Sequence, residues 1–123
     1  MTITSGSGGR GGGSTRQVDV IIADETSLSA AGALGDLSVI GLVVPTFDSA
    51  ALTFQVSTVG TTYYNLYDEA GNEVVIPAST FNRVVAAPLE LRGWRFVKVR
   101  SGTSAAAVNQ TTAAVTITLQ LGE

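Results

Sequence analysis

The chain has 123 residues, enough for one domain with a single modest core. It contains no cysteine and no histidine, which excludes disulfides, metal sites built on thiolate or imidazole, and nucleophiles activated by histidine. Its formal net charge of −3, with 14% charged residues, argues against general nucleic-acid binding.

The first unusual segment is glycine-rich. Residues 5–16 read SGSGGRGGGSTR, and six of these twelve are glycine. Gly6, Gly8 and Gly11 fit the pattern G-x-G-x-x-G, but a dinucleotide site also needs a preceding strand and a following helix. Neither pattern is present, and no Walker lysine follows. The spacing therefore does not indicate a phosphate cradle.

We predict instead that residues 1–16 form an extended Gly/Ser-rich N-terminal arm. Ordering such a segment costs about 1–2 kcal/mol per residue, so contacts with another protein chain would have to compensate. Arg10 and Arg16 are the candidate anchors. The segment lacks the apolar stretch of a secretory signal, and no apolar run is long enough for a membrane span, so we expect a soluble protein.

The remainder, 17–123, is predicted to be an all-β domain. Helical periodicity is almost absent, while alternation of apolar and polar residues recurs, most clearly in VTITLQL from Val115 onward. Strands are predicted at 17–23, 37–44, 52–56, 62–67, 73–76, 83–91, 94–101 and 115–121. About eight short strands separated by turn signals indicate a single antiparallel β-sandwich of jelly-roll or Greek-key type.

Two of these strands allow an assignment of faces. In LTFQV we expect Thr53 and Gln55 to face solvent, opposite the apolar residues. In TYYNLY the alternation places Tyr64 and Leu66 on one face.

Three connections are distinctive. DEAGN at 68–72 predicts a hairpin loop with Gly71 in the left-handed region. The small-residue stretch 25–36 has room for a helical turn after Asp24 or Thr26 as the N-cap. The segment SGTSAAAVNQTT is predicted to be a loop that joins the last two strands.

Basic residues gather in the segment 83–100, which holds five basic side chains and one acidic one. Such an asymmetry can orient a molecule on a partner, so part of this segment is a candidate interface. The alternative is a set of alternating solvent-facing positions. The candidate partner-binding residues here are Arg92, Arg95, Lys98 and Arg100.

The acidic residues of one hairpin are candidates for two kinds of chemistry. The acids Asp68, Glu69 and Glu73 crowd one hairpin, and paired carboxylates serve glycoside hydrolysis or Ca²⁺ binding. Acidic residues in a hairpin turn are usually exposed to solvent and help to form the turn. We therefore expect no catalytic residues, no metal and no cofactor.

The aromatic side chains suggest a second class of function. Tyr63, Tyr67 and Trp94 are candidates for a platform on which a sugar ring stacks. A carbohydrate- or receptor-binding β-sandwich module is therefore the alternative function.

The segments ALTFQVSTVGTTYYNLYDEAGNEV and PLELRGWRFVKVRSGTSAAAVNQTTAAVTITLQL resemble small β-sandwich structural proteins of tailed bacteriophages. The resemblance covers about 50–121 and carries no catalytic residues. It is closest in kind to a capsid decoration, or cement, protein.

This resemblance implies a non-enzymatic protein on the capsid surface of the virion, made in the cytoplasm of the bacterial host. Its partners would be the major capsid protein and its own copies, as a homotrimer, with no nucleic acid and no membrane. The arm would lie over neighbouring coat subunits. A head–tail or tail accessory protein is the alternative within the virion.

Overall fold

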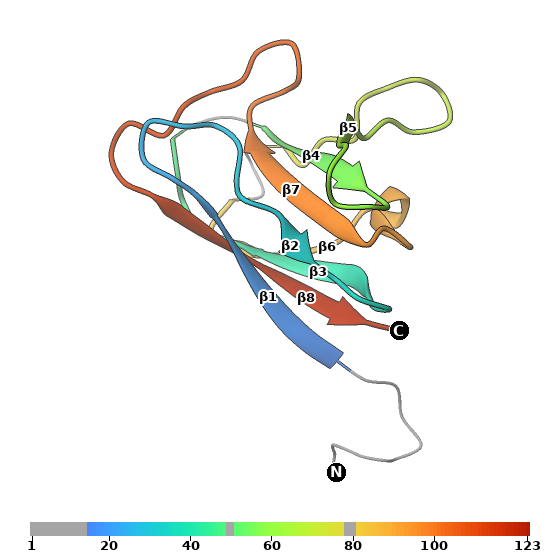
Figure 1. Ribbon diagram of the computed structural model, residues 1–123. Helices are drawn as coiled ribbons and strands as arrows, with labels where there is room; N and C mark the ends of the chain where they lie inside the picture. Colours follow the sequence, from blue (N-terminus) through green and yellow to red (C-terminus); the bar gives the residue numbers. More distant parts are fainter. Residues whose placement is uncertain (1–14, 49–50, 78–80) are drawn as a thin grey trace.

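The computed structural model describes residues 15–48, 51–77 and 81–123. They form two four-stranded antiparallel sheets that pack face to face, so the predicted all-β sandwich is confirmed (Figure 1). Sheet A has the strand order β1-β8-β3-β6, and sheet B has the order β2-β7-β4-β5. The strands are β1 (Thr15–Ile22), β2 (Gly32–Ala33), β3 (Ser38–Val44), β4 (Leu52–Ser57), β5 (Tyr64–Asn65), β6 (Arg83–Ala86), β7 (Phe96–Ser101) and β8 (Val115–Gly122).

The first strand begins two residues earlier than expected. Thr15 and Arg16 were assigned to the arm, but they pair with Gly122 and Leu121 at the end of β8. The rest of the predicted arm, 1–14, including Arg10, lies outside the described residues.

The strands predicted at 17–23, 37–44, 52–56, 94–101 and 115–121 are confirmed to within a few residues. In β8 the side chains of Val115, Ile117, Leu119 and Leu121 are buried, as their alternation predicts. The last two strands are joined by the expected loop, and the hairpin turn is also present. Gly71 has φ +89°, so it occupies the left-handed region that favours glycine.

The connection 25–36 differs from its prediction because it contains no helical turn. Its residues form the two-residue strand β2, which pairs with Val97 and Phe96 of β7. Thr26 does not cap a helix, since its Oγ1 donates a hydrogen bond of 2.8 Å back to the Ala23 carbonyl. Pairing with β7 therefore outweighs any local preference of these small residues for a helical turn.

Two further strands are shorter than predicted. Only 83–86 of the segment 83–91 is a strand, and the 3₁₀ turn η2 (Leu89–Leu91) follows Pro88. The segment 73–76 makes two isolated bridges, Tyr67 with Glu73 and Leu52 with Ile76.

Two residues keep their predicted face but not their expected exposure to solvent. Thr53 is fully buried on β4, where its hydroxyl donates to the Gly102 carbonyl at 2.7 Å. Tyr64 is 68% exposed although Leu66 is buried, because β5 is only two residues long and lies at the edge of sheet B. Tyr64 pairs with the inward-facing Val56, and the Asn65 side chain accepts from Arg100 on the outer face, so the predicted alternation of faces is kept.

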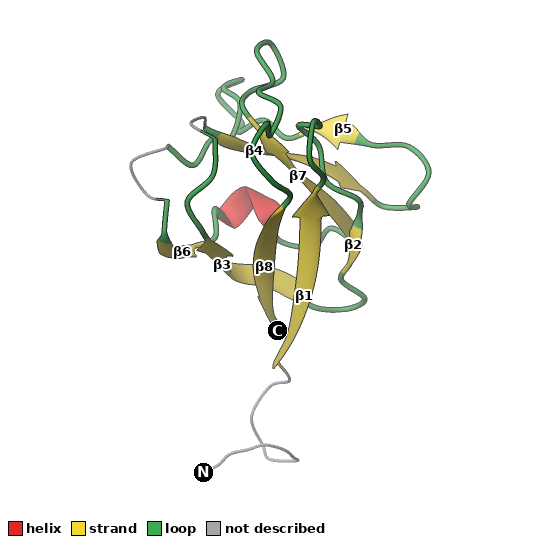
Figure 2. Ribbon diagram, turned by 90° about the vertical axis from the view of Figure 1, so that its left-hand side faces the viewer, coloured by secondary structure: helices red, strands yellow, loops and turns green. Residues whose placement is uncertain are grey.

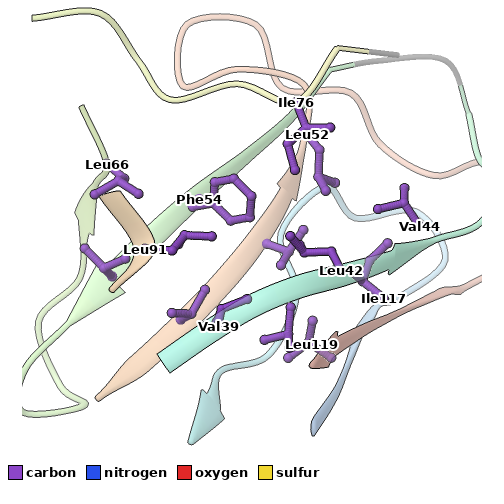
Figure 3. Close-up of a cluster of buried hydrophobic side chains, with 14 of the residues drawn as sticks. Val39, Leu42, Val44, Leu52, Phe54, Leu66, Ile76, Leu91, Ile117 and Leu119 are labelled. Carbon is purple, nitrogen blue, oxygen red and sulfur yellow. The ribbon is translucent and has the colours of Figure 1, made fainter. Parts of the chain in front are cut away.

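The core lies between the two sheets. Inward-facing aliphatic residues of both sheets meet there around the fully buried ring of Phe54 (Figure 3). The turn η2 lies between the two layers in Figure 2 and adds the buried side chain of Leu91. The inner faces are therefore closed, and any interaction must use an outer face or the loops.

Candidate interaction surface

The outer face of sheet A is a broad surface with little charge. Alternation along its four strands turns small hydroxyl, amide and aliphatic side chains outward. They are Gln17, Asp19, Ile21, Ile40, Val43, Val84, Ala86, Thr116, Thr118 and Gln120. Asp19 is the one charged side chain among them.

One row of this surface crosses all four strands in register. Asp19 of β1 lies opposite Thr118 of β8, Thr118 opposite Val43 of β3, and Val43 opposite Val84 of β6. The Asp19 carboxylate accepts a hydrogen bond of 2.7 Å from the Thr118 hydroxyl. Val43 is 43% exposed and Val84 71% exposed, so the row ends in uncovered aliphatic side chains.

A β-bulge adds a further aliphatic side chain to this face. The register between β3 and β8 shifts between Val39 and Gly41, which leaves Ile40 as the extra residue. Its side chain lies over Gly122, where an added Cβ would come within 2.9 Å of the Ile40 Cδ1. Ile40 is still 46% exposed. Exposed aliphatic groups of this kind, gathered on one face of a sheet, are typical of protein contact surfaces.

The outer face of sheet B is closed by a polar network centred on Arg100. The Arg100 Nη2 lies 3.0 Å from Glu73 Oε2, its two Nη atoms donate to Asn65 Oδ1, and its Nε donates to the Thr53 hydroxyl. Glu73 also accepts the backbone N–H of Ser104 at 3.1 Å. The network holds the hairpin 67–73 and the loop after β7 over this face.

The predicted basic segment is dispersed in the structure. Arg100, expected to bind a partner, is only 6% exposed and serves the network above, which makes it a structural residue. The Lys98 Nζ lies over the Tyr63 ring, 4.3 Å from the ring centroid. Arg92 and Arg95 are exposed in the connection between η2 and β7. Arg16 donates from Nη2 to the Leu34 carbonyl at 3.0 Å.

The three predicted aromatic residues do not form one platform. Tyr63 lies under Lys98, and the Tyr67 hydroxyl lies 3.3 Å from the Ser104 hydroxyl. Trp94 lies apart from both, half-buried in a pocket lined by Gly35–Ser38 and Gly93–Arg95.

Two of the three hairpin acids, Asp68 and Glu73, have structural roles. Asp68 Oδ1 accepts the backbone N–H groups of Ala70 and Asn72 at 2.9 Å each, which fixes the turn, and Glu73 pairs with Arg100. Within 15–48, 51–77 and 81–123 no three His, Cys, Asp or Glu side chains group as metal ligands. The same part of the chain has no helix long and apolar enough to cross a membrane.

Sequence reasoning missed a set of contacts that joins the loops at one end of the sandwich. The buried side chain of Gln110 accepts the Asp48 N–H at 3.1 Å and donates to the Ser101 hydroxyl at 2.9 Å. The Asp48 carboxylate accepts the backbone N–H and the hydroxyl of Thr111. These partners lie far apart in sequence, and no local pattern marks them.

The contacts of Asp48 predict a dependence of stability on pH. The Thr111 N–H, and then its hydroxyl, hold the pKa of the Asp48 carboxyl below the usual 3.8. The ionised form is therefore favoured in the folded state. Its stabilisation should be complete above pH 3.8 and be lost as the pH falls through the lower, folded pKa.

We expect Asp48→Asn to be less stable than the parent protein at neutral pH, with a difference that shrinks in strong acid. Unfolding free energies of both proteins, measured across that pH range, test this. A difference that does not change with pH would contradict it.

Comparisons with protein-family models, with curated proteins and with solved structures give no match for this chain.

Proposed function

We propose that this protein is a non-enzymatic structural component of a tailed-bacteriophage virion, a capsid decoration protein that associates with its own copies through the outer face of sheet A. The observation that carries the proposal is that face, with one carboxylate among its outward side chains and exposed Ile21, Ile40, Val43 and Val84. The resemblance of about 50–121 to small virion sandwich proteins supports the same assignment.

The strand order supports a jelly roll as the type of sandwich. Each strand of the first half pairs with its mirror counterpart in the second half: β1 with β8, β2 with β7, β3 with β6 and β4 with β5. This is the pairing expected when one long antiparallel ribbon of eight strands rolls into two sheets, as in viral capsid and lectin jelly rolls. A fold alone does not assign a function, so the proposal rests on the outer face of sheet A.

The chemistry of the face suits association between proteins. Charged side chains are depleted at the centre of interfaces because their desolvation costs free energy, and here only Asp19 would be desolvated. Valine, isoleucine and threonine also have few rotamers to lose when they are covered. Many copies that bind only the assembled shell would stabilise it by mass action.

The arm has a place in this arrangement. β1 follows directly after the glycine-rich segment and is an edge strand of sheet A. An arm attached at that edge would add contacts with the coat subunits to those of the face. The association of copies and the attachment to the shell would then use different parts of the chain.

Val84→Asp should weaken self-association by at least about a hundredfold, because each copy would have to desolvate a new carboxylate in the contact. Val84 is 71% exposed on an edge strand, so the folded monomer should tolerate the change. Light scattering on a sizing column measures the native mass, with a trimer expected for the parent protein and a monomer for the variant.

Two controls isolate the face. Val59→Asp changes an equally exposed valine, 66% accessible in the loop after β4, and should leave the native mass unchanged. Deletion of 1–14, which spares the paired residues of β1, should also keep the mass of the assembly but reduce sedimentation with capsid shells. A monomeric parent protein, or a trimeric Val84→Asp, would refute association through sheet A.

A further inference from the structure

The pocket beside Trp94 is formed by two connections that are far apart in the sequence. It has a volume of about 260 Å³ and is lined by Gly35–Ser38 and Gly93–Arg95. The walls are joined by hydrogen bonds from the Leu34 N–H to the Arg95 carbonyl at 2.8 Å and from the Gly93 N–H to the Ser38 hydroxyl oxygen at 3.1 Å. The pocket is therefore built into the fold rather than left between mobile side chains.

Its aromatic wall is fixed in place. The Trp94 indole Nε1 donates to the Glu90 carbonyl at 2.8 Å, so the orientation of the ring is set by η2. On the opposite connection, Gly35 lies next to Arg16, whose Nη2 would be 3.7 Å from an added Cβ. Gly35 and Gly93 both have positive φ, which favours glycine in both turns. An added Cβ at Gly93 would meet nothing within 4 Å, so this wall of the pocket is open there.

Two oppositely charged groups line this pocket without pairing. Asp36 and Arg95 are both exposed, and within the described part of the chain neither head group has an ion-pair or hydrogen-bond partner. The Ser38 hydroxyl accepts the Gly93 N–H and keeps its own proton free to donate. The pocket is therefore lined by the Asp36 carboxylate, which accepts hydrogen bonds, the planar Arg95 guanidinium, which donates them, the Ser38 hydroxyl and the Trp94 indole.

These groups select a class of ligand. A simple anion would be repelled by Asp36 and a simple cation by Arg95, and an apolar ligand would desolvate both charges without replacing their hydrogen bonds. The classes that suit both groups are a zwitterion and a neutral polyol, and of these the C–H face of a sugar ring also suits the indole. A neutral sugar ring provides hydroxyls that donate to the carboxylate and accept from the guanidinium, and a C–H face that packs on indole. The volume is below the roughly 300–1,000 Å³ of pockets for drug-sized ligands, which fits one ring.

We propose that this pocket, which we name the Trp94 pocket, binds one neutral hexose ring of a saccharide. The site does not depend on the proposed capsid function. Of the three aromatic residues that the sequence offered for sugar binding, the structure assigns this role to Trp94 alone.

The chain has one tryptophan, so its fluorescence reports on this pocket directly. The purified full chain is titrated with glucose, galactose, mannose and N-acetylglucosamine, and with glucuronate and glucosamine as charged analogues. We expect saturable changes in emission with at least one neutral sugar, and weaker binding of the corresponding charged ring. Asp36→Asn and Arg95→Gln should each weaken neutral-sugar binding by about tenfold.

Arg92→Gln is the matched control, because it removes an exposed arginine three positions from Arg95 that does not line the pocket. It should leave binding unchanged, and thermal unfolding confirms that each variant is folded. The proposal is overturned if no neutral sugar gives a saturable change, if both pocket variants bind like the parent protein, or if glucuronate binds best and Asp36→Asn strengthens it. The native mass is also measured with and without sugar, so that a change in self-association through sheet A is not mistaken for sugar binding.

Discussion

Glu73→Ala is expected to lower the free energy of unfolding by about 3 kcal/mol, because it leaves the buried Arg100 guanidinium without its counter-charge. The side chains of Arg100 and Glu73 are only 7% and 12% exposed, so water cannot replace the lost carboxylate without opening the hairpin. The same change removes the acceptor of the Ser104 N–H. For a domain of ordinary stability, roughly 5–15 kcal/mol, this is a large share. Chemical denaturation, with the midpoint and slope both fitted, measures it.

Glu69→Ala provides the control in the same hairpin. Glu69 is exposed and makes no hydrogen bond or ion pair within the described residues, so its loss should change stability by no more than about 0.5 kcal/mol. Glu73→Gln should fall between the two, since the amide keeps one acceptor oxygen for Arg100 or Ser104. Equal effects of the alanine changes at 69 and 73 would show that the ion pair contributes nothing beyond an exposed charge.

Period-2 alternation was sufficient to find the strands that are long enough to express it. β1, β3, β4, β7 and β8 each have six or more residues. Burial alternates along β1 and β8 and, apart from the bulge, along β3, whereas in β4 and β7 outward-facing residues such as Thr53 and Arg100 are buried as well. The strands β2 and β5 have two residues each and exist because β7 and β4 present unpaired edges to them. The sequences of β2 and β5 alone do not indicate strands, because each forms only by pairing with a strand far away in the sequence.

The burial of polar residues could not be predicted from the alternation of apolar and polar residues. Thr53 and Arg100 alternate with apolar neighbours as solvent-facing residues would, and each is buried only because the hairpin and the loop after β7 cover sheet B. The Trp94 pocket depends in the same way on two connections about 60 positions apart, joined by Leu34 and Arg95. The number of charges along a segment could not show that Arg100 is buried while Arg95 is exposed.

The residue that allows the loop after β7 to fold back over sheet B is Gly102. It has φ +91°, and it donates its N–H to the Ala51 carbonyl at 2.6 Å while its own carbonyl accepts the Thr53 hydroxyl. The returning chain passes so close that an added Cβ would lie 2.5 Å from the Ala106 carbonyl oxygen and 2.7 Å from the Val108 nitrogen. Both contacts are with backbone, which cannot rotate away as a side chain would.

Gly102→Ala is therefore expected to destabilise the fold by about 2–5 kcal/mol, from an unfavourable φ of about 1–2 kcal/mol together with overpacking of about 1–3 kcal/mol. Gly71→Ala isolates the first contribution, because Gly71 has nearly the same φ, +89°, and nothing within 4 Å of its added Cβ. It should cost only about 1–2 kcal/mol. Denaturant unfolding of the two variants gives the steric part as their difference. If that difference were zero, the close approach at Gly102 would carry no cost, and the loop would be free to move away from sheet B without disturbing the Glu73–Arg100 pair.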